Sequence, residues 1–276
     1  MTKTRIYYYA DKSFSDRLTN NHFEIWGNNL NEENIVINFS DANSNKPFHI
    51  LAQDIICDYH FVADTQCLPL YRYNKLGNRV DNITAYALKQ FQEHYADETI
   101  TRLNIFHYIY AVLHHPAYRE KYKLNLKREF PRIPFYQDFW QWAGWGQTLM
   151  ELHLNYETAP LYPLQRVDTP ANPDKPPLTP KAKLKADKTA ATIELDTATT
   201  LKGVPPAAWA YKLGNRSALE WVLEYHKERK PRDPTIREKF NTYRLADYKE
   251  QVIELLQRVC TVSVETMRII GEMGEA

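Results

Sequence analysis

The residues of this chain that could do chemistry are lysines and arginines in loops beside aromatic side chains. Both neutralise phosphates, and arginine also forms paired hydrogen bonds with guanine in the DNA major groove. Most lie in segments 41–47, 71–79 and 227–244. The candidate DNA-binding residues are Lys46, Arg72, Lys75, Arg79, Arg216, Arg229, Lys230 and Arg232. As a set they are compatible with DNA, although each taken singly has the ordinary interpretation of a solvated surface side chain.

Catalytic patterns are incomplete. A nuclease would need an Asp followed by an acidic-x-Lys triad to hold magnesium. Glu228-Arg229-Lys230 has the shape of that triad, but it lies in a charged loop without a recognisable strand. An amino-methyltransferase would need an Asn/Asp-Pro-Pro-aromatic loop and a glycine-rich turn, and neither is present; nor is a Gly-x-Ser-x-Gly elbow. We therefore expect no catalytic residue in this chain alone.

One stretch raises the possibility of zinc. His49, Cys57, His60 and Cys67 are close in sequence, but Cys57-x-x-His60 with a single later cysteine is half of a zinc pattern. On a strand, residues 57 and 60 point to opposite faces. We interpret these residues as buried thiols and surface histidine, we interpret His114-His115 as a helix terminus, and we expect no metal site.

Composition describes an ordinary soluble globular chain, with 43% hydrophobic and 25% charged residues and a formal net charge of +1. The charge is uneven: residues 20–70 are acidic, whereas segments 71–79, 117–132 and 181–188 are net positive, which fits one cationic face. Three cysteines do not form a disulfide framework. No leader and no membrane-spanning apolar run are recognisable. We expect a cytoplasmic protein with no membrane partner.

The first 80 residues predict short strands separated by polar loops. From Thr84 the apolar spacing becomes helical, with Leu88, Phe91 and Tyr95 on one face. Residues 101–114 predict a second helix capped by Thr101, followed by a basic helical segment at 117–129. Asp138 is the expected cap of a third helix. Gly144 and Gly146 within it either allow a neighbouring backbone to approach closely or weaken the helix.

The segment from Val167 to about Lys188 is rich in proline and lysine and predicts an exposed loop or linker. A hairpin at about 189–204 follows. Ser217 and Glu220 have the spacing of a capping box at the start of a helix. The last helices are expected from about Ala246 to Ile270. The pattern therefore predicts a strand-rich subdomain at 1–80 with DNA-reading loops, followed by a helical subdomain at 81–165. After the loop or linker at 166–190, a hairpin and C-terminal helices at 191–276 are expected to pack on the helical subdomain.

Several ordered blocks carry a family resemblance. They are RIYYYADKSFSDR, the segments KPFH and QCLPLYRY, FHYIYAVLHHPAYREKY with PRIPF, DFWQWAGWGQTLMELHLNYE, GNRSALEWVLEYHKERK and VCTVSVETMRII. Together they resemble the C-terminal target-recognition (specificity) domain of Type ISP restriction-modification enzymes. Those single polypeptides also contain nuclease, helicase and adenine methyltransferase parts. The surroundings of Asp233-Pro234 depart from the family's pattern, and we expect either an excised domain or a separately encoded fragment.

The resemblance implies an α+β target-recognition-like fold, with a strand-rich N-terminal part and a mostly helical part after it. It implies that the chain recognises double-stranded DNA and positions an adenine-N6 methyltransferase and a helicase-nuclease in a bacterial or archaeal cell. S-adenosylmethionine, ATP and magnesium are expected only in those associated parts. Two alternatives stay open: a protein-interaction or coupling module that does not read bases, and a degenerate nuclease that uses Glu228 and Lys230.

Overall fold

The computed structural model describes residues 20–27, 30, 32–40, 44–55, 65–170, 180–229, 232–235 and 243–274. Contacts divide the chain between Leu154 and Asn155 into two units, each described here by itself. The α+β prediction is confirmed, since both units combine helices with antiparallel sheets. The block RIYYYADKSFSDR, where the first of the short strands is expected, and the residues around Cys57 and His60 lie outside the described residues.

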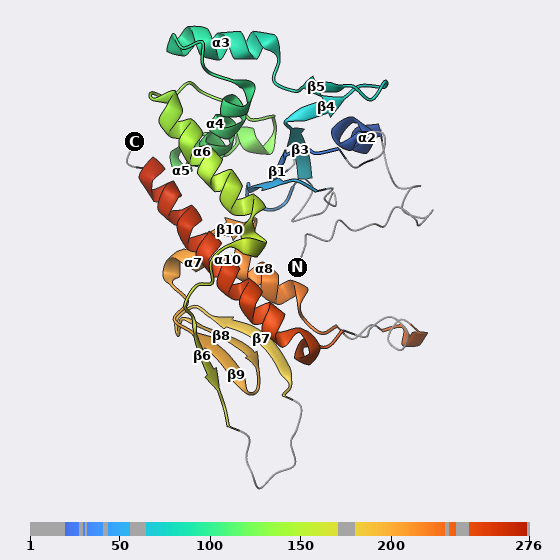
Figure 1. The fold of residues 1–276 in the computed structure, drawn as a ribbon. Helices are drawn as coiled ribbons and strands as arrows, with labels where there is room; N and C mark the ends of the chain where they lie inside the picture. Colours follow the sequence, from blue (N-terminus) through green and yellow to red (C-terminus); the bar gives the residue numbers. More distant parts are fainter. Residues whose placement is uncertain are drawn as a thin grey trace. The chain divides into compact units, whose positions relative to one another are not determined.

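The first unit contains a three-stranded antiparallel sheet in the order β2-β1-β3 (Figure 1). Its strands are β1 (Val36–Ser40), β2 (Ile50–Gln53) and β3 (Thr65–Pro69). A two-stranded hairpin follows, formed by β4 (Tyr71–Tyr73) and β5 (Arg79–Asp81). Helix α2 (Asn20–Trp26) contacts β4. These strands agree with the predicted strand-rich N-terminal part.

The helices of the first unit begin where the capping residues predict. They are α3 (Ala85–Tyr95), α4 (Arg102–His114), α5 (Pro116–Lys121), the 3-10 turn η2 (Asn125–Lys127) and α6 (Phe139–Leu154). Thr84 and Thr101 cap α3 and α4, and the Asp138 side chain accepts a hydrogen bond from Gln141 N at the start of α6. The caps predicted at Thr101 and Asp138 are therefore confirmed, and Thr84, where the helical spacing is predicted to begin, is the cap of α3.

Helices α4 and α6 pack closely, and Gly146 is the reason that they can. A Cβ atom at Gly146 would lie 1.8 Å from the carbonyl oxygen of His107. At Gly144, a Cβ atom would meet nothing within 4 Å. The core around this helix pair includes fully buried Tyr108, Tyr110 and Leu149. Tyr110 also connects the pair to the sheet, because its hydroxyl accepts a hydrogen bond from Ala52 N of β2.

The basic helix predicted at 117–129 is wrong in its length. Helix α5 ends at Lys121, and only the 3-10 turn at 125–127 follows. Like charges four residues apart, at Arg119, Lys123 and Lys127, give the segment no helical support along that row. Arg119 itself has a structural role: its Nε donates to the Leu113 carbonyl at the end of α4 (2.6 Å), and its guanidinium lies over the Phe48 ring.

The second unit begins with the 3-10 turn η3 (Tyr156–Thr158) and contains a four-stranded antiparallel sheet in the order β6-β9-β8-β7. Its strands are β6 (Gln165–Asp168), β7 (Ala182–Asp187), β8 (Thr192–Asp196) and β9 (Thr199–Lys202). The predicted hairpin is confirmed as β8–β9. The prediction of a loop or linker at 166–190 is wrong for β6 and β7. Buried Leu184 between exposed Lys183 and Lys185 is a strand alternation that the lysine-rich composition hid.

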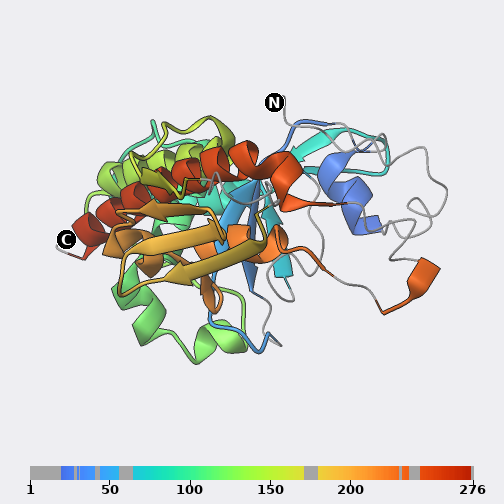
Figure 2. The same cartoon turned by 90° about the horizontal axis from the view of Figure 1, so that it is seen from below.

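The remaining elements of this unit are α7 (Pro206–Ala210), the short hairpin β10 (Lys212–Leu213) and β11 (Arg216–Ser217), α8 (Ala218–Tyr225) and α10 (Leu245–Met273). The capping box of Ser217 and Glu220 is confirmed. One helix of 29 residues, α10, replaces the several C-terminal helices expected. It packs on α7 and α8, and its first turns lie beside the four-stranded sheet (Figures 1 and 2). The predicted packing of 191–276 on the helical segment stays a prediction.

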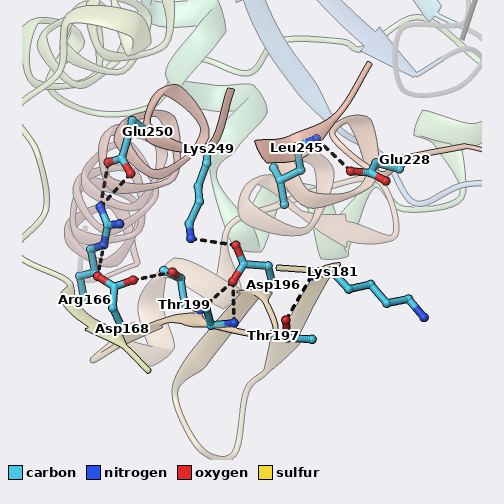
Figure 3. Close-up of polar contacts among 11 residues, drawn as sticks. Arg166, Asp168, Lys181, Asp196, Thr197, Thr199, Glu228, Leu245, Lys249 and Glu250 are labelled. Atoms are coloured by element: carbon cyan, nitrogen blue, oxygen red, sulfur yellow. Dashed lines mark hydrogen bonds and ion pairs between the residues drawn. The ribbon is translucent and has the colours of Figure 1, made fainter. Parts of the chain in front are cut away.

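Polar contacts join α10 to the sheet (Figure 3). Arg166 of β6 lies between two carboxylates, with Nη1 2.8 Å from Glu250 and Nε 2.7 Å from Asp168. Lys249 Nζ lies 2.8 Å from the buried carboxylate of Asp196, which also accepts hydrogen bonds from the backbone of Ala198 and Thr199. Burial acts to raise the pKa of Asp196, but these donors lower it below its usual value. The ionised carboxylate thus stabilises the unit.

Candidate nucleic-acid interface

Three of the predicted cations lie on the β4–β5 hairpin. Its register pairs Arg72 with Val80 and Tyr73 with Arg79. Because directly paired residues share one face of a sheet, Arg72 and Arg79 lie on opposite faces of this ribbon. Lys75 lies in the turn between the strands and is exposed. The hairpin therefore presents positive charge on both faces and at its tip.

The turn of this hairpin is held by its own hydrogen bonds. The Asn74 side-chain oxygen accepts from the backbone N–H groups of Leu76 (2.9 Å) and Asn78 (3.0 Å). Gly77 donates to the Asn74 carbonyl, and Asn74 N donates to the Asn78 carbonyl. Gly77 has φ +79°, a left-handed conformation that glycine adopts without strain. An asparagine and a glycine thus fix the tip at the positions where such turns prefer them.

The base of the hairpin is anchored to the rest of the first unit. Buried Asn34 donates to the carbonyls of Ile25 and Tyr71, and it accepts from Tyr71 N. Arg102 Nε lies 3.4 Å from the Asp81 carboxylate and donates to the Ile83 carbonyl. These contacts hold both strands where they leave the core, so the ribbon projects from a fixed base.

The arginines of the hairpin make weak contacts that leave them exposed. Arg72 Nη2 lies 3.6 Å from the Glu24 carboxylate, and both side chains are more than half exposed. Such surface pairs contribute about 0–1 kcal/mol. The Arg79 guanidinium lies 4.3 Å from the centre of the Tyr71 ring. A phosphate could therefore engage either arginine at little cost to the fold.

A second group of cations surrounds Glu224 in the second unit. Arg216 Nη2 lies 3.6 Å and Lys227 Nζ 2.9 Å from the Glu224 carboxylate. The hydrogen bond from Lys227, helped by the charges of Arg216 and Arg229, lowers the pKa of Glu224. Arg216 also lies over the Trp221 ring at 5.0 Å. We call these residues, Arg216, Glu224, Lys227 and Arg229, the Glu224 cluster.

The two ends of the charged loop at 227–244 are joined by a hydrogen bond. Leu245 N, at the start of α10, donates to the Glu228 carboxylate (3.0 Å; Figure 3). Because Arg244 offers α10 no side-chain cap, Glu228 caps the helix from the far end of the loop. Tyr243 stacks on Tyr248 beside this contact. Glu228, the acidic residue of the nuclease-like triad, thus has a structural role.

The other predicted residues do not gather into one site. Lys46 is half-buried, and its backbone N–H donates to Ser44 Oγ. Arg232 is exposed, and Lys230 lies outside the described residues. Arg72, Lys75 and Arg79 come together in the first unit, and Arg216 and Arg229 in the second. Glu224 and Lys227 were not among the residues predicted from the sequence. Arg216 lies directly before the capping box of α8, and Glu224 lies one helical turn after it. This spacing could have indicated the contact between Arg216 and Glu224.

Histidines and carboxylates in the described part of the chain do not form a metal site: no group of three or more His, Cys, Asp or Glu residues there could hold an ion. His49 is buried, with Nδ1 3.2 Å from the Pro47 carbonyl. His114 is buried at the end of α4, with Nδ1 donating to the Tyr110 carbonyl. The helix-terminus interpretation of His114-His115 is confirmed, since α4 ends at His114 and His115 is its C-cap.

Comparison with known proteins identifies the family. A family model described as the Type ISP C-terminal specificity domain matches residues 4–255. The chain belongs to this family. No match was found among curated proteins. Within the described residues of this specificity domain, no helix is both long and apolar enough to span a membrane.

Three solved structures are similar to this specificity domain. A DrdV–DNA complex is 58% identical with a TM-score of 0.85, and the match covers 91% of this chain and 25% of that one. A nuclease-deletion mutant of the Type ISP enzyme LlaGI, bound to a DNA substrate mimic, is 27% identical with a TM-score of 0.71 over 91% of this chain and 22% of that one. The DNA-bound Type ISP enzyme LlaBIII, at 24% identity and a TM-score of 0.68, shows the shared fold over 88% of this chain and 16% of its own. The specificity domain therefore spans a quarter or less of each of these chains.

Proposed function

We propose that this chain recognises a specific double-stranded DNA sequence as the target-recognition part of a Type ISP restriction-modification system. The observation that carries the proposal is the similarity to the DrdV chain, 58% identical over 91% of this chain, in a complex with DNA. Family membership over residues 4–255 supports it.

Two cationic surfaces would make the contacts. Arg72, Lys75 and Arg79 on the β4–β5 hairpin would engage phosphates and base edges from a fixed base. Arg216, Lys227 and Arg229 of the Glu224 cluster would add contacts with the DNA backbone from the second unit. Further contacts of this kind are proposed for Lys46, Lys230 and Arg232. Phosphate contacts set the position of a protein on the duplex, whereas contacts with base edges distinguish sequences.

The remaining activities would belong to other parts of a longer enzyme. Membership of this family suggests that the chain positions a helicase-nuclease and an adenine-N6 methyltransferase. The methyltransferase would rotate its target base out of the helix. S-adenosylmethionine, ATP and magnesium would bind in those parts. The whole enzyme would act in the bacterial or archaeal cytoplasm.

The test is selection of bound duplexes from a random pool, with and without the methyltransferase part. We expect one short sequence to be enriched. Binding to that sequence should weaken steeply with salt, because each phosphate contact that releases a counterion adds about 0.9 to the slope of log affinity against log salt. Failure to bind any duplex, or an affinity that salt does not change, would contradict the proposal.

A coupling module that does not read bases is the second candidate. Exposed hydrophobic side chains in the first unit favour it, including Tyr86 at 71% exposure and Phe130 at 59%, since a domain within a longer chain must contact its neighbours. The triple variant Arg72→Ala, Lys75→Ala, Arg79→Ala separates the two candidates. Unchanged DNA binding by this variant would favour coupling, and a large loss would favour recognition.

The degenerate-nuclease hypothesis is weaker in the structure than in the sequence. Glu228, which it requires as a magnesium ligand, caps α10 through Leu245 N. Magnesium-dependent cutting that is lost in Glu228→Gln would restore the hypothesis, provided that the variant keeps the thermal stability of the parent chain.

A further inference from the structure

Leu76 at the tip of the β4–β5 hairpin is exposed in a way that the fold does not require. It is 82% exposed, the highest value among the large hydrophobic residues of the described part of the chain. The neighbouring residues of the tip, Asn74, Lys75 and Asn78, are polar or charged. A leucine held in water at this place gains stability only when a partner covers it.

The tip presents this side chain in a defined conformation. Leu76 N is held by the Asn74 side chain, and the next residue, Gly77, takes the left-handed conformation that closes the turn. The strands below are anchored by Asn34 and by the Arg102–Asp81 pair. The backbone of the tip would therefore lose little conformational freedom on binding. This preorganisation favours the interpretation that the tip binds a partner.

The charges beside Leu76 indicate what the partner is. Lys75 adjoins it, and Arg72 and Arg79 lie on the two faces of the ribbon below it. A two-stranded ribbon fits into the major groove, where the walls are phosphates and the floor is base edges. Cations on both faces match the two walls, and the tip reaches the floor.

Leucine offers neither a donor nor an acceptor, so it cannot bind phosphate or read polar base edges. The apolar group that the major groove presents is the C5 methyl of thymine. We infer that Leu76 contacts a thymine methyl group and is a specificity-determining residue. The inference rests on the proposed DNA recognition and adds the residue and the chemical group that it reads.

The experiment compares Leu76→Ala with Leu124→Ala on the selected duplex. Leu124 is a matched control, because it is also a strongly exposed leucine of the first unit but lies between α5 and η2. We expect Leu76→Ala to lose about tenfold in affinity, the order of a few buried carbon atoms, with an unchanged salt slope because no charge is removed. Leu124→Ala should bind like the parent chain.

Replacing each thymine of the duplex by uracil, one at a time, then identifies the base. One replacement should weaken binding by the parent chain and leave binding by Leu76→Ala unchanged, since the partner is already lost. Equal affinities of Leu76→Ala and Leu124→Ala would overturn the inference. So would a loss in Leu76→Ala without any such uracil effect, as expected if the leucine were a wedge between base steps in the minor groove. If the parent chain binds no duplex, the proposed function itself fails.

Discussion

Lys249 of α10 forms an ion pair with Asp196 of β8, and it is the most buried pair between this helix and the sheet in Figure 3: the side chains are 17% and 5% exposed. A buried carboxylate that loses its cation costs far more than a surface pair contributes. The pair therefore holds the first turns of α10 against the sheet.

We predict that Lys249→Met destabilises the chain by about 2–4 kcal/mol, because Asp196 keeps only its backbone donors. Urea denaturation measures the loss. The double variant Lys249→Met, Asp196→Asn should recover part of it, since no unpaired charge remains. A double variant that loses the sum of the two single effects would contradict this role of the pair.

The two glycines of α6 should respond in opposite directions to alanine. Gly146→Ala places a methyl group against the His107 backbone, which must shift, and we expect destabilisation by about 1–3 kcal/mol. Gly144→Ala meets open space and should stabilise the helix by roughly 0.5–1 kcal/mol. Thermal unfolding of the two variants measures both effects. Equal unfolding midpoints would show that the close approach of α4 to Gly146 does not make the chain sensitive to a side chain there.

Acid should destabilise the first unit through its buried histidines. Burial, with the charge of Arg119, lowers the pKa of His153 to about 3, and burial also lowers the pKa of His114. Tyr110 O–H donates to His153 Nδ1 at 2.6 Å, as suits a neutral ring. Below pH 6.5 the unfolded chain binds protons that the folded chain does not, so stability falls as pH falls.

The expected slope is about 1.4 kcal/mol per pH unit for each such histidine. Urea denaturation at pH 7, 6 and 5 measures it. His153→Gln, which can still accept from Tyr110, should reduce the slope while His114 keeps its share. A variant with the slope of the parent chain would show that His153 takes up its proton in the folded state.

The Glu224 cluster predicts a variant with stronger DNA binding. The Glu224 carboxylate pairs with cations that would otherwise bind phosphate. Glu224→Gln should therefore raise the affinity for DNA about threefold to tenfold at low salt and steepen its salt dependence. Glu265→Gln, which also removes one acidic group from the second unit, is the control and should have little effect, because its partner Arg268 is not a proposed DNA contact and also pairs with Glu272. An equal gain in both variants would show an effect of net charge alone.

Much of this fold could be predicted from local patterns. Thr84, Thr101, Asp138 and the Ser217–Glu220 box marked helix starts correctly, because a cap needs only the residues next to it. Strands β6 and β7 were missed because their pairing depends on distant partners and on a single buried residue, Leu184, within a lysine-rich segment. In that segment the proline- and lysine-rich composition was a stronger signal than the alternation of buried and exposed residues.

The candidate interface could be predicted only in part. Loop cations such as Arg72 and Arg79 are visible in the sequence, but only the strand register reveals that they lie on opposite faces. The structural roles of Arg119 and Glu228 depend on the Leu113 carbonyl and Leu245 N, which no local pattern indicates. Charge in a sequence shows what could bind phosphate, and tertiary contacts decide which charges already have another role.

A hydrogen bond from Leu245 N to the Glu228 carboxylate joins the two ends of the 229–244 segment. A segment closed in this way can change in length at a small entropic cost, since doubling a loop costs about 0.6 kcal/mol. New sequences could therefore be inserted between Arg229 and Arg244 without moving the first turn of α10. If the segment contacts the DNA backbone as proposed, exchanging it would change the affinity for DNA, whereas the β4–β5 hairpin would keep the target preference.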